Sequence, residues 1–167
     1  MLNNDDHIGP QFLCLHGQAG TGKSIMMRKI SALARSKGKI ISMCASTNLA
    51  ALCFPNCTTA HSLFGYPVLE NPDVNDAVDK IECNPSNERR ELLAETNVII
   101  WDEVFVNHHD LFDAVVELMK DNQRLIIVIT GDGRQCPVVV PFGNVGETIA
   151  ASMISSPHWN KFTVVIL

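Results

Sequence analysis

The chain has 167 residues, of which 46% are hydrophobic, and a formal net charge of −5 at neutral pH. This length suits a single domain with a sizeable core, and the acidic balance excludes a domain that holds nucleic acid by bulk positive charge alone. The longest apolar runs are strand-sized, so no transmembrane helix and no membrane partner are expected. Residues 1–11 are polar and aperiodic, which predicts a frayed lead-in without a targeting signal, and residues 12–167 are expected to form the domain.

The first strong pattern is an apolar strand at 12–15, a glycine-rich loop and a helix that ends near Gly38. The loop matches G-x-x-x-x-G-K-[ST] and reads Gly17, Gln18, Ala19, Gly20, Thr21, Gly22, Lys23, Ser24. Glycines let backbone N–H groups converge on a polyphosphate. Lys23 is then expected to reach the β- and γ-phosphates, and the Ser24 hydroxyl to bind Mg²⁺. The pattern predicts nucleotide binding.

The middle of the chain is less regular. Residues 39–45 form a continuous apolar run that predicts a buried strand. Short helices or turns are expected at 47–52 and 58–64. Residues 66–96 are interpreted as loops around one or two surface helices, of which 87–95 is the better candidate.

The second half alternates strands and helices. A run of four apolar residues, 98–101, predicts a strand that delivers Asp102 and Glu103 at its carboxyl end. The later elements are predicted as a helix at 110–121, a strand at 125–129, a helix at 144–155 and a strand at 163–167. This alternation indicates an α/β fold with a mostly parallel sheet flanked by helices, whose ligand crevice lies beyond the carboxyl ends of the strands.

Three polar groups are expected to meet the glycine-rich loop in that crevice. Asp102 would hold Mg²⁺ directly or through water, and Glu103 would orient and deprotonate an attacking water. Gln135 follows the 125–129 strand and could hydrogen-bond the γ-phosphate. The second acid favours ATP hydrolysis over a kinase or a G protein, which would need the first acid alone.

The six cysteines include no C-x-x-C pair, and Cys14 and Cys44 lie in apolar strand-like runs. Reduced thiols in an intracellular protein are therefore expected. Cys53, Cys57 and His61 recur at four-residue spacing, which leaves zinc as an alternative, but a proline between them interrupts any helix and no fourth ligand is evident.

Taken in order, these motifs resemble the helicase motifs of the Pif-family, RecD-like DNA helicases of superfamily one, in the branch associated with Helitron transposons. The segments that carry the resemblance are 17–24, 47–51, 59–62, 100–103, 131–138 and 156–160.

The resemblance implies a RecA-like P-loop NTPase fold that acts as the first motor domain of a 5′-to-3′ helicase. Such a domain hydrolyses Mg-ATP and, with a second RecA-like domain, translocates on single-stranded DNA in repair, recombination or telomere maintenance; a nuclear location is expected on the same ground. The roles carried over are phosphate and Mg²⁺ binding for Lys23 and Ser24, the Walker B pair for Asp102 and Glu103, and γ-phosphate sensing for Gln135. The residues implied along the DNA path are Thr47, Thr59, His61 and Ser62.

The sequence also departs from the family pattern. The differing positions are Asn48, Val104, Thr130 and Gly133. The segment that reads adenine in this family is not recognisable, since Gln11 is a poor substitute. Neither a second motor domain nor its arginine finger is present in the 167 residues. Feeble hydrolysis by this chain alone is therefore expected. The alternatives are an ATP- or DNA-binding remnant of such a helicase, and a small kinase, for which no arginine-rich lid is evident. If DNA binds, the acid-rich stretch 70–95 should face away from it, and base stacking would fall to His61 and Phe64.

Overall fold

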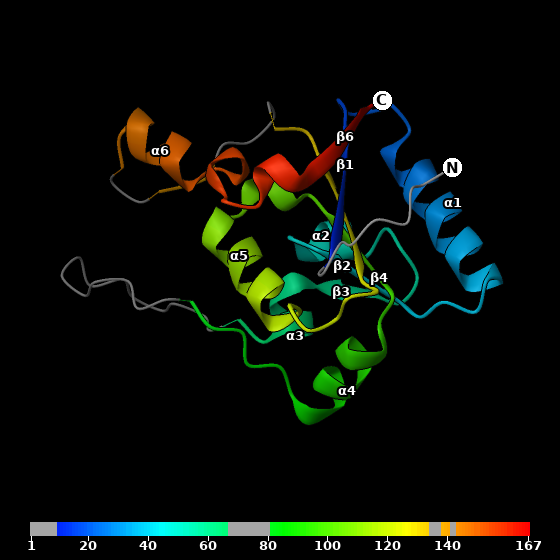
Figure 1. The fold of residues 1–167 in the computed structure, drawn as a ribbon. Coiled ribbons are helices and arrows are strands. Elements are labelled where there is room, and N and C mark those ends of the chain that lie inside the picture. The colour runs from blue at the N-terminus through cyan, green and yellow to red at the C-terminus, as the bar shows by residue number, and fades with distance from the viewer. Residues whose placement is uncertain (1–9, 67–80, 134–137, 141–142) are drawn as a thin grey trace.

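The computed structural model describes residues 10–66, 81–133, 138–140 and 143–167. Its centre is a six-stranded sheet in the order β3-β2-β4-β5-β1-β6, and every neighbouring pair is parallel (Figure 1). The strands are β1 (Gln11–His16), β2 (Ile41–Ala45), β3 (Cys57–Thr59), β4 (Val98–Asp102), β5 (Ile126–Gly131) and β6 (Phe162–Ile166). The α/β fold with a parallel sheet predicted from the sequence is confirmed.

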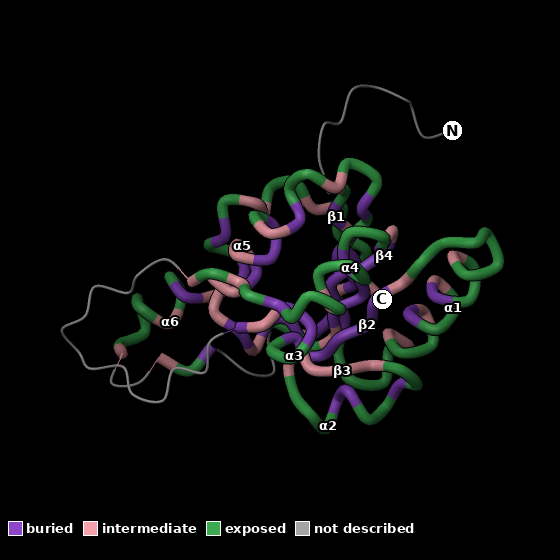
Figure 2. Tube along the Cα trace, turned by 90° about the horizontal axis from the view of Figure 1, so that it is seen from below, coloured by how far each residue is buried: buried purple, intermediate pink, exposed green. Residues whose placement is uncertain are grey.

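Helices cover both faces of the sheet, which explains why the central strands are apolar throughout rather than alternating. Figure 1 shows α1 (Lys23–Ser36) and α5 (His109–Leu118) on opposite sides of the strands. Along β4, Ile99 and Trp101 pack in the cluster that contains α5, whereas Ile100 packs in the cluster that contains α1. Buried residues accordingly concentrate in the strands, while the outer sides of the helices are exposed (Figure 2).

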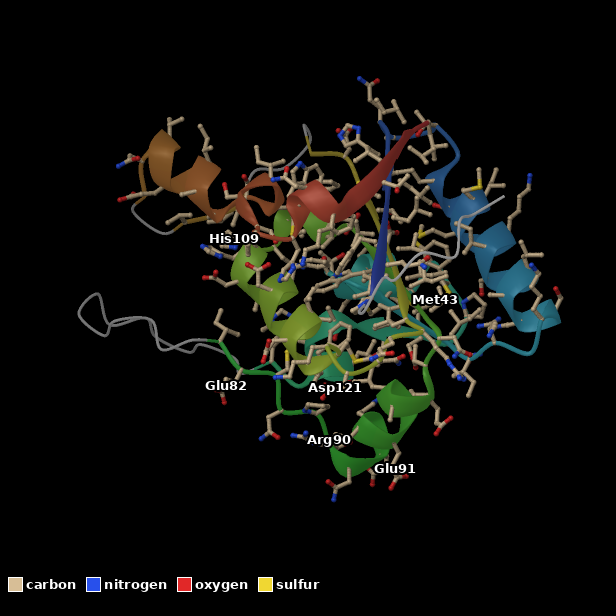
Figure 3. All side chains as sticks on the ribbon, in the orientation of Figure 1. Met43, Glu82, Arg90, Glu91, His109 and Asp121 are labelled. Carbon is tan, nitrogen blue, oxygen red and sulfur yellow. The ribbon has the colours of Figure 1, made fainter. Side chains whose placement is uncertain are left out.

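The packing between the sheet and α1 is visible around Met43 of β2, which lies among closely spaced side chains in Figure 3. Met27 of α1 is fully buried in the same cluster. The helix begins after Gly22 and is followed by Gly38, whose φ of 69° suits a glycine at a helix end. The helix predicted to end near Gly38 is therefore confirmed.

The other helices are short. They are α2 (Asn48–Ala51), α3 (Ala60–Phe64), α4 (Asn87–Glu95) and α6 (Val145–Ala151), with 3-10 turns η1 (Val104–Val106), η2 (Met153–Ser155) and η3 (Trp159–Lys161). The surface helix predicted at 87–95 coincides with α4, which begins at a Ser86 cap. Among the helices of the described residues, none combines the length and the apolar character needed to cross a bilayer.

Three predicted elements need correction. The helix or turn expected at 58–64 starts with strand residues, because 57–59 pair with β2 and α3 begins only at Ala60. The helix expected at 110–121 ends at Leu118, where the amide of Met119 closes the last turn. The helix expected at 144–155 ends at Ala151, because Ser152 adopts an extended conformation. In each case the correct boundary is set by a local turn or a distant strand partner that periodicity does not report.

Candidate functional site

The glycine-rich loop connects the carboxyl end of β1 to the start of α1. Gly20 and Gly22 have φ angles of 81° and 95°, values that side chains other than glycine rarely adopt. The loop is also tied to the neighbouring strand, since the amide of Gly17 donates to the carbonyl oxygen of Gly131 at 3.3 Å. The loop therefore bends back at the N-terminus of a 14-residue helix, which is the arrangement that binds phosphate.

Lys23 folds over this loop. Its ammonium donates hydrogen bonds to the carbonyl oxygens of Gly17, at 2.6 Å, and Gln18, at 2.8 Å. Ser24 follows in the first turn of α1 and is exposed. An anion on the loop would compete with these carbonyls for the same ammonium.

Asp102 and Glu103 leave the sheet at the same edge as this loop. Only β5 separates β4 from β1. Trp101 is in register with Ile129, and Thr130 with Leu15, so Asp102 lies level with the end of β1. With strands about 4.8 Å apart, the backbone of Asp102 is about 10 Å from that of β1. The structure thus brings the acid pair and the loop together at the carboxyl ends of neighbouring strands.

Asp102 is half-buried and held in place by two hydrogen bonds to Oδ1. The hydroxyl of Thr130, which is fully buried, donates to it at 2.5 Å, and the amide of Glu103 donates at 2.9 Å. The other carboxylate oxygen, Oδ2, makes no hydrogen bond to the described residues. Asp102 is therefore oriented through one oxygen and able to bind a ligand through the other.

Glu103 has an unusual backbone for a residue with a side chain, with φ of 55° in the left-handed region. Its side chain is exposed, and Oε2 accepts a hydrogen bond of 2.9 Å from the hydroxyl of Thr47. Such strained positions cluster at functional sites. Thr47, placed by resemblance on the DNA path, thus contacts the predicted catalytic base.

Ser46, which the sequence analysis did not single out, ties β2 to the acid pair. Its hydroxyl oxygen accepts hydrogen bonds from the indole N–H of Trp101, at 3.0 Å, and from the side-chain NH₂ of Asn107, at 2.7 Å. The same hydroxyl donates to the carbonyl oxygen of Asp102 at 3.3 Å. A polar residue at the carboxyl end of a predicted strand was the available signal.

The end of β5 approaches the turn after the acid pair. A Cβ on Gly131 would lie 2.7 Å from Cδ2 of Phe105, so only glycine fits there without movement. His16 packs edge-on against the same ring, at 5.9 Å between centroids. Gln135, the predicted γ-phosphate sensor, lies outside the described residues, so its position stays a prediction.

The predicted DNA-path residues are Thr47, which caps α2, Thr59 at the end of β3, and His61 and Ser62 on α3. Thr59 and Ser62 line a cavity of about 500 Å³ together with Asn48. His61 is exposed and packs edge-on against Tyr66, at 5.3 Å between centroids. The expectation that Phe64 could stack on a base is wrong, because its side chain is fully buried against Trp101.

The described cysteines form no disulfide with one another, and their exposure differs: Cys14 and Cys44 are buried, whereas Cys53 is exposed. Burial raises the pKa of Cys57 to about 11, with a smaller contribution from the charge of Asp102, and raises that of Cys44 well above its usual value. The zinc alternative at Cys53, Cys57 and His61 gains no support, since these three do not form a close group of ligand atoms.

One different group of possible metal ligands was missed by the sequence analysis. Within the described parts of the chain, only His108, His109 and Asp110 bring three ligand atoms within 4.8 Å of one another. These groups already contact each other, because Nδ1 of His108 and Nδ1 of His109 lie 3.2 and 3.3 Å from the carboxylate oxygens of Asp110. His109 also contacts Asp113 at 2.8 Å, and His108 caps α5. Partial burial lowers the pKa of His108, against the opposing charge of Asp110.

The fold and the loop define a RecA-like P-loop protein, with the acid pair on the strand beyond β5. The family model of the PIF1-like helicases matches residues 3–167, and the chain belongs to that family.

Its relatives by sequence are longer helicases. The chain is 37% identical over 161 residues to the ATP-dependent DNA helicase PIF1 of Emericella nidulans, covering 90% of this chain and 21% of that protein. It is 35% identical over 132 residues to the PIF1 helicase of Candida albicans, covering 74% of this chain and 14% of that protein. The chain thus spans 21% and 14% of the length of these two relatives.

Solved structures of the same family share the fold. Bacteroides Pif1 bound to single-stranded DNA superimposes with a TM-score of 0.71 at 23% identity, covering 94% of this chain and 38% of that one. Candida albicans Pif1 gives a TM-score of 0.67 at 24% identity, covering 94% and 36%. The RecA-like fold implied by the sequence resemblance is confirmed.

Proposed function

We propose that this chain is the ATP-binding and ATP-hydrolysing motor domain of a DNA helicase that translocates 5′-to-3′ on single-stranded DNA. The observation that carries the proposal is the meeting of the glycine-rich loop with Asp102 and Glu103 at one edge of the sheet, with only β5 between them. Family membership agrees with it.

The residues at this edge fit Mg-ATP. Ser24 and Asp102 offer a hydroxyl and a carboxylate, the hard oxygen ligands that Mg²⁺ prefers, and Oδ2 of Asp102 is available for it. Bound Mg²⁺ would neutralise charge on the phosphate oxygens. Lys23 would exchange its loop carbonyls for the β- and γ-phosphates, and Glu103 would take the proton of the attacking water. In this proposal Gln135 registers the γ-phosphate.

Single-stranded DNA is the proposed track, along the surface formed by Thr47, Thr59, His61 and Ser62. The cavity beside α2 and α3 supports this placement. A Bacteroides relative of the same fold has been solved with single-stranded DNA. We propose that a second RecA-like domain, from a longer form of the protein or another chain, completes the motor and supplies the arginine finger, which contributes on the order of 10³ to 10⁵ in rate.

We propose the finer assignments on the sequence resemblance alone. These are the domain limits at 12–167, the Helitron-associated branch, roles in DNA repair, recombination or telomere maintenance, and an intracellular, nuclear location.

The alternative is a remnant that binds ATP or DNA without turnover. It is favoured by the departures from the family pattern taken together, at Asn48, Val104, Thr130 and Gly133.

Nucleotide binding and ATP hydrolysis distinguish the motor domain from the remnant. Affinity for a fluorescent ATP analogue with Mg²⁺ should fall about tenfold or more in Lys23→Ala, because a charge-assisted contact is lost. Lys29→Ala, an exposed lysine on the same helix, should bind like wild type. Absence of nucleotide binding by wild type would overturn the proposal.

Hydrolysis is then measured with and without single-stranded DNA. DNA-stimulated turnover that disappears in Lys23→Ala supports the motor. Nucleotide binding without turnover, even after a second RecA-like domain is added, supports the remnant. Transfer of phosphate to a small molecule would contradict both.

A further inference from the structure

We propose that Thr47 is a positioning residue that holds Glu103 in a resting orientation until single-stranded DNA displaces α2. This inference deepens the proposed function and rests on it, because it assigns a means by which the DNA surface would control the same hydrolytic site.

The hydroxyl of Thr47 makes two hydrogen bonds at once. Its oxygen accepts from the amide of Ala50 at 3.2 Å, capping α2, and its proton is donated to Oε2 of Glu103 at 2.9 Å. One atom therefore connects the first turn of α2 to the carboxylate. A shift of α2 that separates them by about 1 Å takes the second contact beyond hydrogen-bonding distance.

Packing does little to hold the Glu103 side chain. It is exposed, and among the described residues Thr47 is the only side chain that donates a hydrogen bond to its carboxylate. By contrast, neighbouring Asp102 is fixed by the buried Thr130. The orientation of Glu103 thus depends on Thr47, whereas that of Asp102 does not.

The contact is a restraint rather than a catalytic support. A hydroxyl that donates to a carboxylate competes with the water whose proton that carboxylate would accept. Lys23 is restrained in a similar way, because its ammonium donates hydrogen bonds to the carbonyl oxygens of Gly17 and Gln18. Lys23 and Glu103 are thus both hydrogen-bonded to groups of the chain itself.

The element attached to Thr47 is suited to movement. α2 is a single turn that packs on the domain through only two small residues, Ala50 and Ala51, while Leu49 within it and Leu52 just after it are 78% and 84% exposed. The cavity that it borders is lined by Asn48, Thr59 and Ser62. Nucleic acid that enters this cavity would contact α2 directly and draw the Thr47 hydroxyl away from Glu103.

The test compares four proteins by single-turnover ATP hydrolysis, with protein in excess over ATP and no DNA present. Thr47→Val keeps the shape and removes the hydroxyl; its rate should rise about threefold or more, the factor that one solvent-exposed hydrogen bond is worth. The ratio of DNA-stimulated to DNA-free rate should fall by the same factor. Thr47→Ser retains the hydroxyl and should restore wild-type behaviour.

Two controls separate the restraint from the helix cap. Ser86→Ala removes an equivalent cap from the remote helix α4 and should match wild type. In a Glu103→Gln background, Thr47→Val should have no further effect, because the restrained group is gone.

A rate in Thr47→Val that is equal to or below that of wild type, including no turnover in either, would overturn the inference. So would a change confined to the DNA concentration required for half-maximal stimulation, which would make Thr47 a DNA contact alone. Nucleotide affinity is measured on the same samples. If nucleotide binding depends on Lys23 but the hydrolysis rate does not change in Thr47→Val, only this inference is refuted. If wild type does not bind nucleotide at all, the proposed function is refuted.

Discussion

Thr130 and Asp102 lie on adjacent strands, and the Thr130 hydroxyl donates a 2.5 Å hydrogen bond to Oδ1 of Asp102. A buried residue thereby sets the orientation of the proposed Mg²⁺ ligand. Loss of a residue that orients a ligand commonly weakens metal binding by 10- to 100-fold. Because Asp102 keeps its second bond from the amide of Glu103, we expect Thr130→Val to raise the Mg²⁺ concentration required for nucleotide binding by about three- to tenfold.

Titration of Mg²⁺ against fluorescent ATP binding measures this effect. Thr163→Val, on the exposed edge strand β6, is the matched control and should titrate like wild type. An unchanged requirement in Thr130→Val would show that the bond does not orient Asp102 toward Mg²⁺.

Ser46→Ala should destabilise the fold by about 2 kcal/mol or more. The change leaves two buried donors, on Trp101 and Asn107, without the hydroxyl that accepts from both, and unpaired buried groups carry their full desolvation cost. Urea unfolding followed by Trp fluorescence measures the difference. Ser36→Ala removes a hydroxyl at an exposed helix end and should change the free energy of unfolding by less than about 0.5 kcal/mol; similar losses in both variants would refute the buried network.

Thiol reactivity should follow burial. Burial raises the pKa of Cys14 to about 12 and that of Cys44 well above its usual value, so few thiolates are present near pH 8. Cys53 is exposed. Iodoacetamide on the native protein should label Cys53 before Cys14 and Cys44, as read by peptide mass spectrometry, and denaturant should abolish the difference. Early labelling of Cys44 would contradict its burial in the core beneath the sheet-covering helices.

Stability should fall as the pH is lowered from 7 through 6.5. Partial burial, and then Lys161, lower the pKa of His158 below its ordinary value of 6.5, against the opposing charges of Asp113 and Glu117. Between the two pKa values the unfolded chain binds more protons than the folded one, so the free energy of unfolding is largest above 6.5 and decreases toward the folded pKa.

His158→Asn should flatten this slope in part, since the pKa of His108 is lowered as well. Asn160→Ala, an exposed neighbour that cannot titrate, should leave the slope unchanged. Chemical unfolding at a series of pH values supplies the comparison, and a slope that is as steep in His158→Asn as in wild type would exclude His158 as its source.

Elements with a strong local signal could be predicted from the sequence. The glycine-rich loop and α1 are specified by consecutive residues, because the φ angles at Gly20 and Gly22 are local properties of the chain. The 98–101 strand was predicted from its apolar continuity, and it is part of β4. The helix predicted at 87–95 coincides with α4, and the structure adds that Ser86 caps it. Strand β3 was missed, because its three residues are defined by pairing with β2 rather than by a pattern of their own.

The sequence alone therefore determined which chemical groups the protein has: a phosphate loop, an ammonium, a hydroxyl and two adjacent acids. Only the tertiary structure decided which other side chains hydrogen-bond to these groups. The bond from Thr47 to Glu103 spans 56 positions and the bond from Thr130 to Asp102 spans 28, and both exist because the sheet places β4 between β2 and β5. Strand order is a property of long-range pairing, and hydrogen bonds between side chains at strand ends follow from it.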